Sequence, residues 1–257
     1  MKTIEEKILN IGVLDIAIAD IQSLSHEEYA LARKDYFGAS DSSILCGVNL
    51  YKQMSALIKE KNTKELTKEE IEVSEKPIVR KGYDLEEFIL GYAEKELGVA
   101  VYKPKDMYKF KNIDGLSVNY DGVSEIDNRL IPVEAKLVSK FGEKYYNKTI
   151  TVLEARDVDM FVEGDSLEQH ITKKALRFGI PAYYYTQVQQ EIAGLDAPYG
   201  YLTARFDESW TQKTYLIKRD DYVINGIFNR CEKHIGEIKR DQCLSFFCLN
   251  VFRSELS

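Results

Sequence analysis

This sequence of 257 residues lacks long hydrophobic runs and has only three histidines. No run approaches the roughly 20 apolar residues that a membrane helix needs. The first residues, MKTIEEK, carry acids where a signal peptide would be basic. His170 has no second histidine or cysteine at metal-ligand spacing, so a zinc site is not expected there. These absences predict a cytoplasmic protein with no membrane partner.

Paired cysteines are also missing. The four cysteines form no CxxC motif and no disulfide-like framework; they are Cys46, Cys231, Cys243 and Cys248. This scatter favours free, partly buried thiols.

Basic charge is in short supply, because 42 acidic residues outnumber 35 lysines and arginines and leave a net charge of -7. Generic nucleic-acid binding depends on Lys and Arg neutralising phosphates. Any DNA site must therefore be a local basic groove. Apolar residues are plentiful, since 44% hydrophobic and 11% aromatic content supports one large domain or two small ones.

The stretch 116–139, LSVNYDGVSEIDNRLIPVEAKLVS, carries the most informative pattern. Two β-type runs, 116–120 and 130–138, flank a polar connection and predict two adjacent antiparallel strands. Glu134 and Lys136 are two residues apart, so in a strand their side chains project to the same face. Asp121 closes the first run, where pairing would bring its carboxylate beside Glu134. Pro132 cannot donate to a strand ladder, which predicts a strand start or an edge at that point.

These residues suit phosphodiester hydrolysis. Two adjacent carboxylates repel each other unless a cation lies between them. Hard divalent ions such as Mg²⁺ take oxygen ligands, so Asp121, Glu134 and a backbone carbonyl could bind one, with Lys136 beside a metal-bound water. The alternative is an ordinary charged face on an edge strand.

Apolar residues at helical spacing predict several helices. They are 3–21 with Thr3 as N-cap, a helix from Ser25 with Glu28 in capping-box spacing, 79–97, 181–194 with Pro181 near its first position, and 221–240. Residues 62–77 indicate a solvated linker or a short helix. Further strands are expected within 99–114, 199–205 and 214–217.

Three polar features have both a structural and a functional interpretation. Ser40 or Asp41 can cap a helix, but a helix start with small residues also suits a phosphate. In the helix 181–194, Gln187 and Glu191 share a face, and buried amides need partners, which favours a polar site over plain core. Lys140, which follows the 130–138 strand among aromatic residues, is either a contact to nucleic-acid backbone or part of a solvated face.

Four motifs occur in one order along the chain: R…GASD at 33–41, GYDLE at 82–86, D…EAK at 121–136 and YYTQVQ at 184–189. Together they resemble the YqaJ-type viral recombinase and lambda-type exonuclease family of the PD-(D/E)xK nuclease superfamily. Their joint occurrence in order is far more specific than any single motif.

The resemblance implies an α/β fold, a central mixed β-sheet flanked by helices with a restriction-endonuclease-like core. It implies one nuclease domain, 1–257, with an N-terminal helical extension (1–30), the core (31–205) and C-terminal strand and helical elements (206–257). The implied site has three groups of residues. The ligands of Mg²⁺ or Mn²⁺ are Asp121, Glu134, the carbonyl of Ala135 and Glu86. Lys136 orients or deprotonates water, Gln187 is the family's helix glutamine, and the residues that bind DNA phosphates are Arg33, Ser40 and Lys140.

The implied activity is metal-dependent hydrolysis of DNA, with a 5′ to 3′ exonuclease on duplex ends for phage-type recombination as the favoured form. The implied partners are DNA, a single-strand annealing protein and further copies of the same chain. An endonuclease of the same fold, or a non-catalytic module that binds DNA ends or protein, are the alternatives. The complete D…ExK set argues against the non-catalytic one.

Some relatives in the superfamily hold an iron–sulfur cluster with one cysteine before the nuclease motifs and three after, as counted here. The spacing differs, because eleven residues separate Cys231 from Cys243 and four separate Cys243 from Cys248. Such clusters use tighter runs. Free thiols remain the favoured interpretation.

Overall fold

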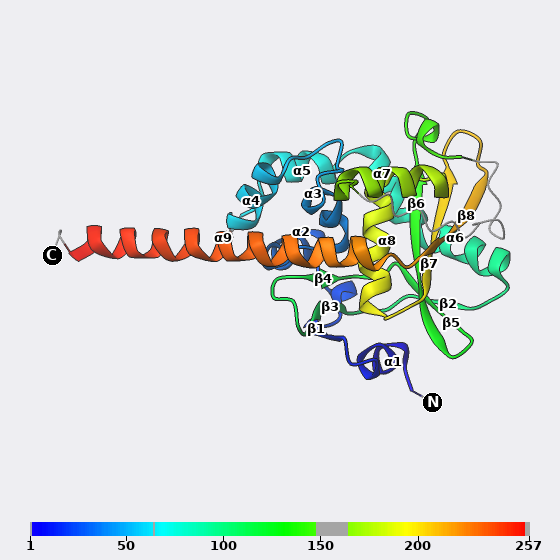
Figure 1. Ribbon diagram of the computed structural model, residues 1–257, viewed down its shortest axis with the longest axis horizontal. Helices are drawn as coiled ribbons and strands as arrows, with labels where there is room; N and C mark the ends of the chain where they lie inside the picture. Colours follow the sequence, from blue (N-terminus) through cyan, green and yellow to red (C-terminus); the bar gives the residue numbers. More distant parts are fainter. Residues whose placement is uncertain (1, 64, 148–163, 255–257) are drawn as a thin grey trace.

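The computed structural model describes residues 2–63, 65–147 and 164–254 (Figure 1). Its centre is a five-stranded sheet in the order β2-β5-β6-β7-β8. These strands are β2 (Val101–Tyr102), β5 (Gly122–Ile126), β6 (Arg129–Val138), β7 (Tyr199–Phe206) and β8 (Gln212–Lys218). Strands β6 and β7 are parallel and the other pairs antiparallel. The predicted central mixed sheet is confirmed.

Two long helices, α6 (Pro77–Leu97) and α8 (Ala182–Gly194), cover opposite faces of this sheet (Figure 1). On β7, Arg205 lies 5.4 Å from the ring centre of Phe88 in α6. A Cβ at Gly200 would lie 3.0 Å from Val188 Cγ1 in α8. Residues five apart in a strand point to opposite faces, so the sheet lies between the two helices. Both helices were expected within a few residues of these bounds.

A smaller three-stranded sheet, β1-β3-β4, lies beside the first. Its strands are β1 (Leu14–Ile18), β3 (Met107–Phe110) and β4 (Ser117–Val118). The remaining helices are α1 (Ile4–Asn10), α2 (His26–Ala32), α3 (Ser42–Leu45), α4 (Met54–Asn62), α5 (Lys68–Ser74), α7 (Leu167–Phe178) and α9 (Asp221–Ser254), with short 3₁₀ turns at Ile21–Ser23, Arg33–Asp35, Ala39–Asp41 and Glu143–Tyr145. Within the described ranges, no helix is long and apolar enough to span a membrane.

The prediction that residues 116–120 pair with residues 130–138 is wrong. Residues 117–118 form β4 of the small sheet, and β6 pairs instead with β5, from inside the predicted connection. The reason is a two-residue turn: Asp127 and Asn128 both have positive φ, 50° and 60°, between the paired residues Ile126 and Arg129. Such turns favour tight hairpins, and Asn and Asp tolerate this conformation.

Pro132 fits β6 because one side of the strand is unpaired there. It faces Val123 of β5, while pairing with β7 begins only at Val133. Gly200 leaves room for the proline ring, since a Cβ at Gly200 would lie 3.0 Å from Pro132 Cγ. The sequence predicted a strand start or an edge at Pro132. In the structure this edge is local: Pro132 lies inside the central strand β6, at a point where only β5 pairs with it.

The helix predicted for 3–21 is wrong beyond its first two turns. Thr3 caps α1 in a capping box with Glu6, but the helix ends at Asn10. Gly12 has φ +88°, a conformation that glycine adopts without strain, and the chain then enters β1. Leu14 is fully buried there and pairs with Phe110 of β3. Isoleucine-rich sequence thus formed a strand once a partner strand was available.

Candidate active site

Asp121, Glu134 and Lys136 lie together where β5 begins, beside the middle of β6. The Ala135 N–H donates to Asp121 Oδ2 over 3.0 Å, which ties the aspartate to β6 from its place just before β5. Lys136 Nζ contacts Glu134 Oε1 directly and lies 3.9 Å from Asp121 Oδ2. The D…ExK pattern is therefore one cluster in space, with the lysine between the two acids.

Glu134 is the most deeply buried of these acids, with 1% of its side chain exposed. Burial, and then the charge of Asp121, raise the pKa of Glu134 to about 8, against the opposing effect of Lys136. Gln187 Nε2, from α8, donates to Glu134 Oε1. Gln187 thus ties the Glu134 carboxylate, which Lys136 also contacts, to α8.

Glu191 joins this cluster; the sequence placed it on the helix face of Gln187, but it was not among the predicted site residues. It is 1% exposed, and its Oε1 accepts a hydrogen bond from Gln187 Nε2 at 3.2 Å. Burial raises the pKa of Glu191 well above its usual value, and the charges of Glu134 and Asp121 raise it further. The available signal was its place four residues after Gln187, on the same helix face.

Glu86 approaches the cluster from α6 and is half-buried. Lys103 Nζ lies 2.8 Å from Glu86 Oε1. Burial raises the pKa of Glu86, followed by the charge of Asp121, so the two acids lie within electrostatic range. Glu87, the next residue on this helix, is exposed.

The donor set fits a divalent cation. Within the described residues, no three His, Cys, Asp or Glu side chains are already arranged to hold a metal ion. However, the carboxyl groups of Glu86, Asp121, Glu134 and Glu191 face the ammonium groups of Lys103 and Lys136, and three of the four have raised pKa values. A buried excess of negative charge is costly, and carboxylate oxygens with a backbone carbonyl such as that of Ala135 are ligands that Mg²⁺ prefers.

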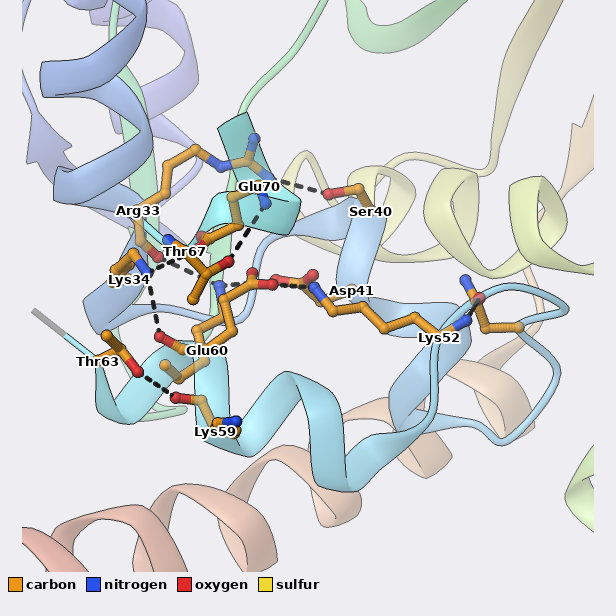
Figure 2. Close-up of polar contacts among 12 residues, drawn as sticks. Arg33, Lys34, Ser40, Asp41, Lys52, Lys59, Glu60, Thr63, Thr67 and Glu70 are labelled. Carbon is orange, nitrogen blue, oxygen red and sulfur yellow. Dashed lines mark hydrogen bonds and ion pairs between the residues drawn. The ribbon is translucent and has the colours of Figure 1, made fainter. Parts of the chain in front are cut away.

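Arg33 and Ser40 lie together, as Figure 2 shows. Arg33 Nη2 donates to Ser40 Oγ at 2.9 Å. Gly38 permits this approach, since a Cβ there would lie 3.1 Å from Arg33 Nη2. Asp41 fixes the turn, because its Oδ2 accepts from the Gly38 N–H at 3.0 Å and pairs with the buried Lys61 at 2.9 Å. This rigid turn presents a guanidinium and a hydroxyl side by side.

Tyr29 connects this pair to the acidic cluster. Its ring centre lies 5.4 Å from Arg33 Cζ. Burial raises the pKa of Tyr29, and the charges of Asp121 and Glu86 contribute in the same direction. Arg33 therefore lies on the side of the molecule where the acids converge.

Lys140 lies apart from the cluster. It follows β6, is exposed, and pairs with Glu208 at 2.6 Å. The two other glutamines of α8 hold main chain: Gln189 Nε2 donates to the Lys218 carbonyl and Gln190 Nε2 to the Ser117 carbonyl, both at 2.7 Å.

The histidine and cysteines considered at the start have ordinary structural settings where they can be described. His170 is buried, with Nε2 2.8 Å from Asp220 Oδ2. Cys46 and Cys231 are free, buried thiols. The side chains of Cys243 and Cys248 lie outside the described part of the chain. The alternative of an iron–sulfur cluster, which needs these two cysteines, therefore also lies outside it.

Known proteins share this architecture. The family model of the YqaJ-like viral recombinase domain matches residues 28–195. A crystal structure of an alkaline exonuclease, LHK-Exo from Laribacter hongkongensis, is similar with 17% identity and a TM-score of 0.54. That of LHK-Exo in complex with dAMP has 18% identity and a TM-score of 0.56. Both comparisons cover 90% of this chain and 100% of the other. No curated protein matches the chain in sequence.

The matched segment is more than half of the chain and contains all four motifs, from Arg33 to Gln189. At 17% and 18% identity, the similarity to the solved structures shows the fold. The predicted resemblance is confirmed: the chain belongs to the YqaJ-like viral recombinase domain family.

Proposed function

We propose that this protein is a divalent-metal-dependent deoxyribonuclease that digests duplex DNA from its 5′ ends. The observation that carries the proposal is the convergence of Asp121, just before β5, with Glu134 and Lys136 of β6 and Gln187 of α8. Family membership and a fold shared with an alkaline exonuclease support it. A bound Mg²⁺ or Mn²⁺ would supply Lewis-acid activation of the phosphate and of water.

Each side chain has a distinct task in this proposal. Asp121, Glu134, the Ala135 carbonyl and Glu86 hold the metal. Burial would lower the pKa of Lys136, but the charges of Glu134 and Asp121 raise it well above its usual value. Lys136 is therefore an ammonium group at neutral pH and orients the attacking water or a phosphate oxygen by donating to it. Deprotonation of water by Lys136, the other role open from sequence, is disfavoured.

The preference for ends rests on Arg33 and Ser40. A guanidinium binds a phosphate through paired, charge-assisted hydrogen bonds, and the adjacent hydroxyl adds another. An exonuclease that starts at a 5′ end needs such a group for the terminal phosphate, while an endonuclease has no end to hold. The 2.9 Å contact keeps the two side chains together before DNA arrives.

Linear and closed circular duplex DNA, incubated with the protein and Mg²⁺, test the proposal. Linear DNA should be degraded and circles spared. Arg33→Ala should depress digestion of 5′-phosphorylated ends strongly and of 5′-hydroxyl ends much less. Arg219→Ala is the matched control, because this arginine forms ion pairs with the exposed Asp196 and Asp221 and has no role in the proposal. Nicking of circles, with equal rates on both kinds of end, would instead identify an endonuclease.

DNA is the proposed substrate and partner. An annealing protein, self-association, contact of Lys140 with DNA phosphates and a cytoplasmic location stay predictions.

A further inference from the structure

An aromatic pocket of about 260 Å³ lies where β6 leaves the sheet. Its rings are those of Tyr51, Phe141, Tyr145, Tyr146, Tyr183 and Tyr184. Residues 137–139, which directly follow Lys136 on β6, line it as well. Lys136 Nζ lies 5.5 Å from the ring centre of Tyr184. The aromatic pocket and the candidate active site therefore share a wall.

The rings at the mouth of the aromatic pocket are unusually exposed. Phe141 is 83% exposed and Tyr51 is 76% exposed. Tyr51 meets Tyr183 edge to face with ring centres 5.9 Å apart, and Tyr183 meets Tyr184 at 4.5 Å. Grouped apolar side chains left in water around a hollow are typical of a ligand groove. Single exposed aromatics would need no such explanation.

Polar groups accompany the rings. Tyr146 is 8% exposed, and its hydroxyl has no hydrogen-bond partner in the described part of the chain. A buried hydroxyl without a partner is unfavourable, so a ligand that supplies one is favoured. Lys144 also lines the pocket, with Nζ 4.9 Å from the ring centre of Tyr145. Stacking faces, a hydroxyl and an ammonium suit a planar ring with polar edges that is joined to a phosphate.

We propose, resting on the proposed function, that the aromatic pocket receives one nucleobase of the strand whose phosphodiester lies at Asp121 and Glu134. Ligand pockets generally have roughly 300–1,000 Å³, so this smaller volume suits one base and no stacked pair. A base inside it has left its own stack and its pairing partner. The nucleotide beside the cleaved bond is therefore unstacked before hydrolysis. Stacking on aromatic rings accepts any base, so this step is independent of sequence.

A binding experiment tests the pocket without cleavage. Short 5′-phosphorylated duplexes carry 2-aminopurine at one position each, and Ca²⁺ replaces Mg²⁺. The fluorescence of 2-aminopurine should change on binding at one position, or two neighbouring ones. Phe141→Ala and Tyr51→Ala should weaken binding about tenfold, as expected for the loss of one stacking ring, and suppress that change. Phe141→Trp should retain both the affinity for DNA and the fluorescence change.

Leu176→Ala is the control, since Leu176 is 79% exposed on α7, outside the pocket. Phe141 is exposed, so neither substitution removes much buried area, and equal melting temperatures check this. Alanine variants that match the wild type in affinity and fluorescence would overturn the proposal that the pocket binds a base. A wild-type protein with no fluorescence change specific to one position of 2-aminopurine would overturn it as well. Digestion with Mg²⁺ is measured on the same protein. No digestion, combined with a fluorescence change that Phe141→Ala abolishes, would refute the proposed function and still support the pocket.

Discussion

Lys136 lies between two acids of the site, in contact with Glu134 and 3.9 Å from Asp121 Oδ2. A residue that orients or donates to a reacting group acts on turnover more than on metal affinity. Lys136→Ala should therefore slow turnover by roughly 10²–10³-fold, the range for loss of one positioned hydrogen-bond donor, and leave Mn²⁺ binding nearly intact. Turnover and calorimetric affinity measured together check this. A variant within a few-fold of wild type would show that Lys136 belongs to an ordinary charged face.

Glu134 makes stability depend on pH in an unusual direction. Its pKa in the folded protein is about 8, above its ordinary value of 4.5, and Glu191 is shifted the same way. The folded state therefore binds this proton more tightly than the unfolded chain. The stabilisation that the protonated Glu134 contributes is complete below pH 4.5 and is lost as the pH rises through about 8. Metal-free protein should accordingly be less stable at pH 8 than at pH 5 in urea unfolding.

Glu134→Gln is the matched variant, because the amide keeps the shape and cannot titrate. Its free energy of unfolding should vary less over the same pH range. A wild-type stability that rises from pH 5 to pH 8 would contradict the assignment of this effect to Glu134.

At the scale of elements, the contact between β7 and α8 depends on one missing side chain. A Cβ at Gly200 would lie 3.0 Å from both Pro132 Cγ and Val188 Cγ1, and 3.1 Å from Ile192 Cγ1. These neighbours are branched or cyclic and have little freedom to move. Gly200→Ala should therefore cost about 1–3 kcal/mol, the usual range for overpacking a core. Chemical denaturation measures the free energy of unfolding.

Gly91 provides the opposite case within α6. No atom lies within 4 Å of a Cβ built there, and the residue is inside the helix. Gly91→Ala should stabilise the protein by about 1 kcal/mol, because alanine favours the helix. If both glycine variants changed stability alike, the close packing of β7 on α8 would not be the cause.

At the scale of the whole molecule, a net charge of -7 opposes the approach of DNA. The candidate site gathers four of these acids, so a divalent cation would both complete it and reduce this repulsion. A ligand that binds only the folded state raises the melting temperature. Mn²⁺ should therefore raise the melting temperature of the wild-type protein, and EDTA should reverse the change. Asp121→Ala should abolish the rise, while Glu208→Gln, at an exposed ion pair, should preserve it.

The sequence alone determined features that depend on local repetition. Period-two spacing set Glu134 and Lys136 on one strand face, the N-cap Thr3 marked the start of α1, and the capping box of Ser25 and Glu28 marked the start of α2. Helical spacing and Pro181 predicted α8, whereas Gln187 was assigned only through the resemblance of YYTQVQ to the family motif. Each of these depends on neighbours within a few residues, which the sequence displays directly.

Only the tertiary structure decided which distant residues meet. It paired β6 with β5 in place of β4, and it turned part of the predicted first helix into β1, because strand partners are chosen by packing over long separations. It buried Glu191 in hydrogen-bond contact with Gln187. It also gathered aromatic residues as far apart in the sequence as Tyr51 and Tyr184 into one pocket. Burial, and with it the pKa of a carboxyl group or the exposure of an aromatic ring, is a property of the whole fold.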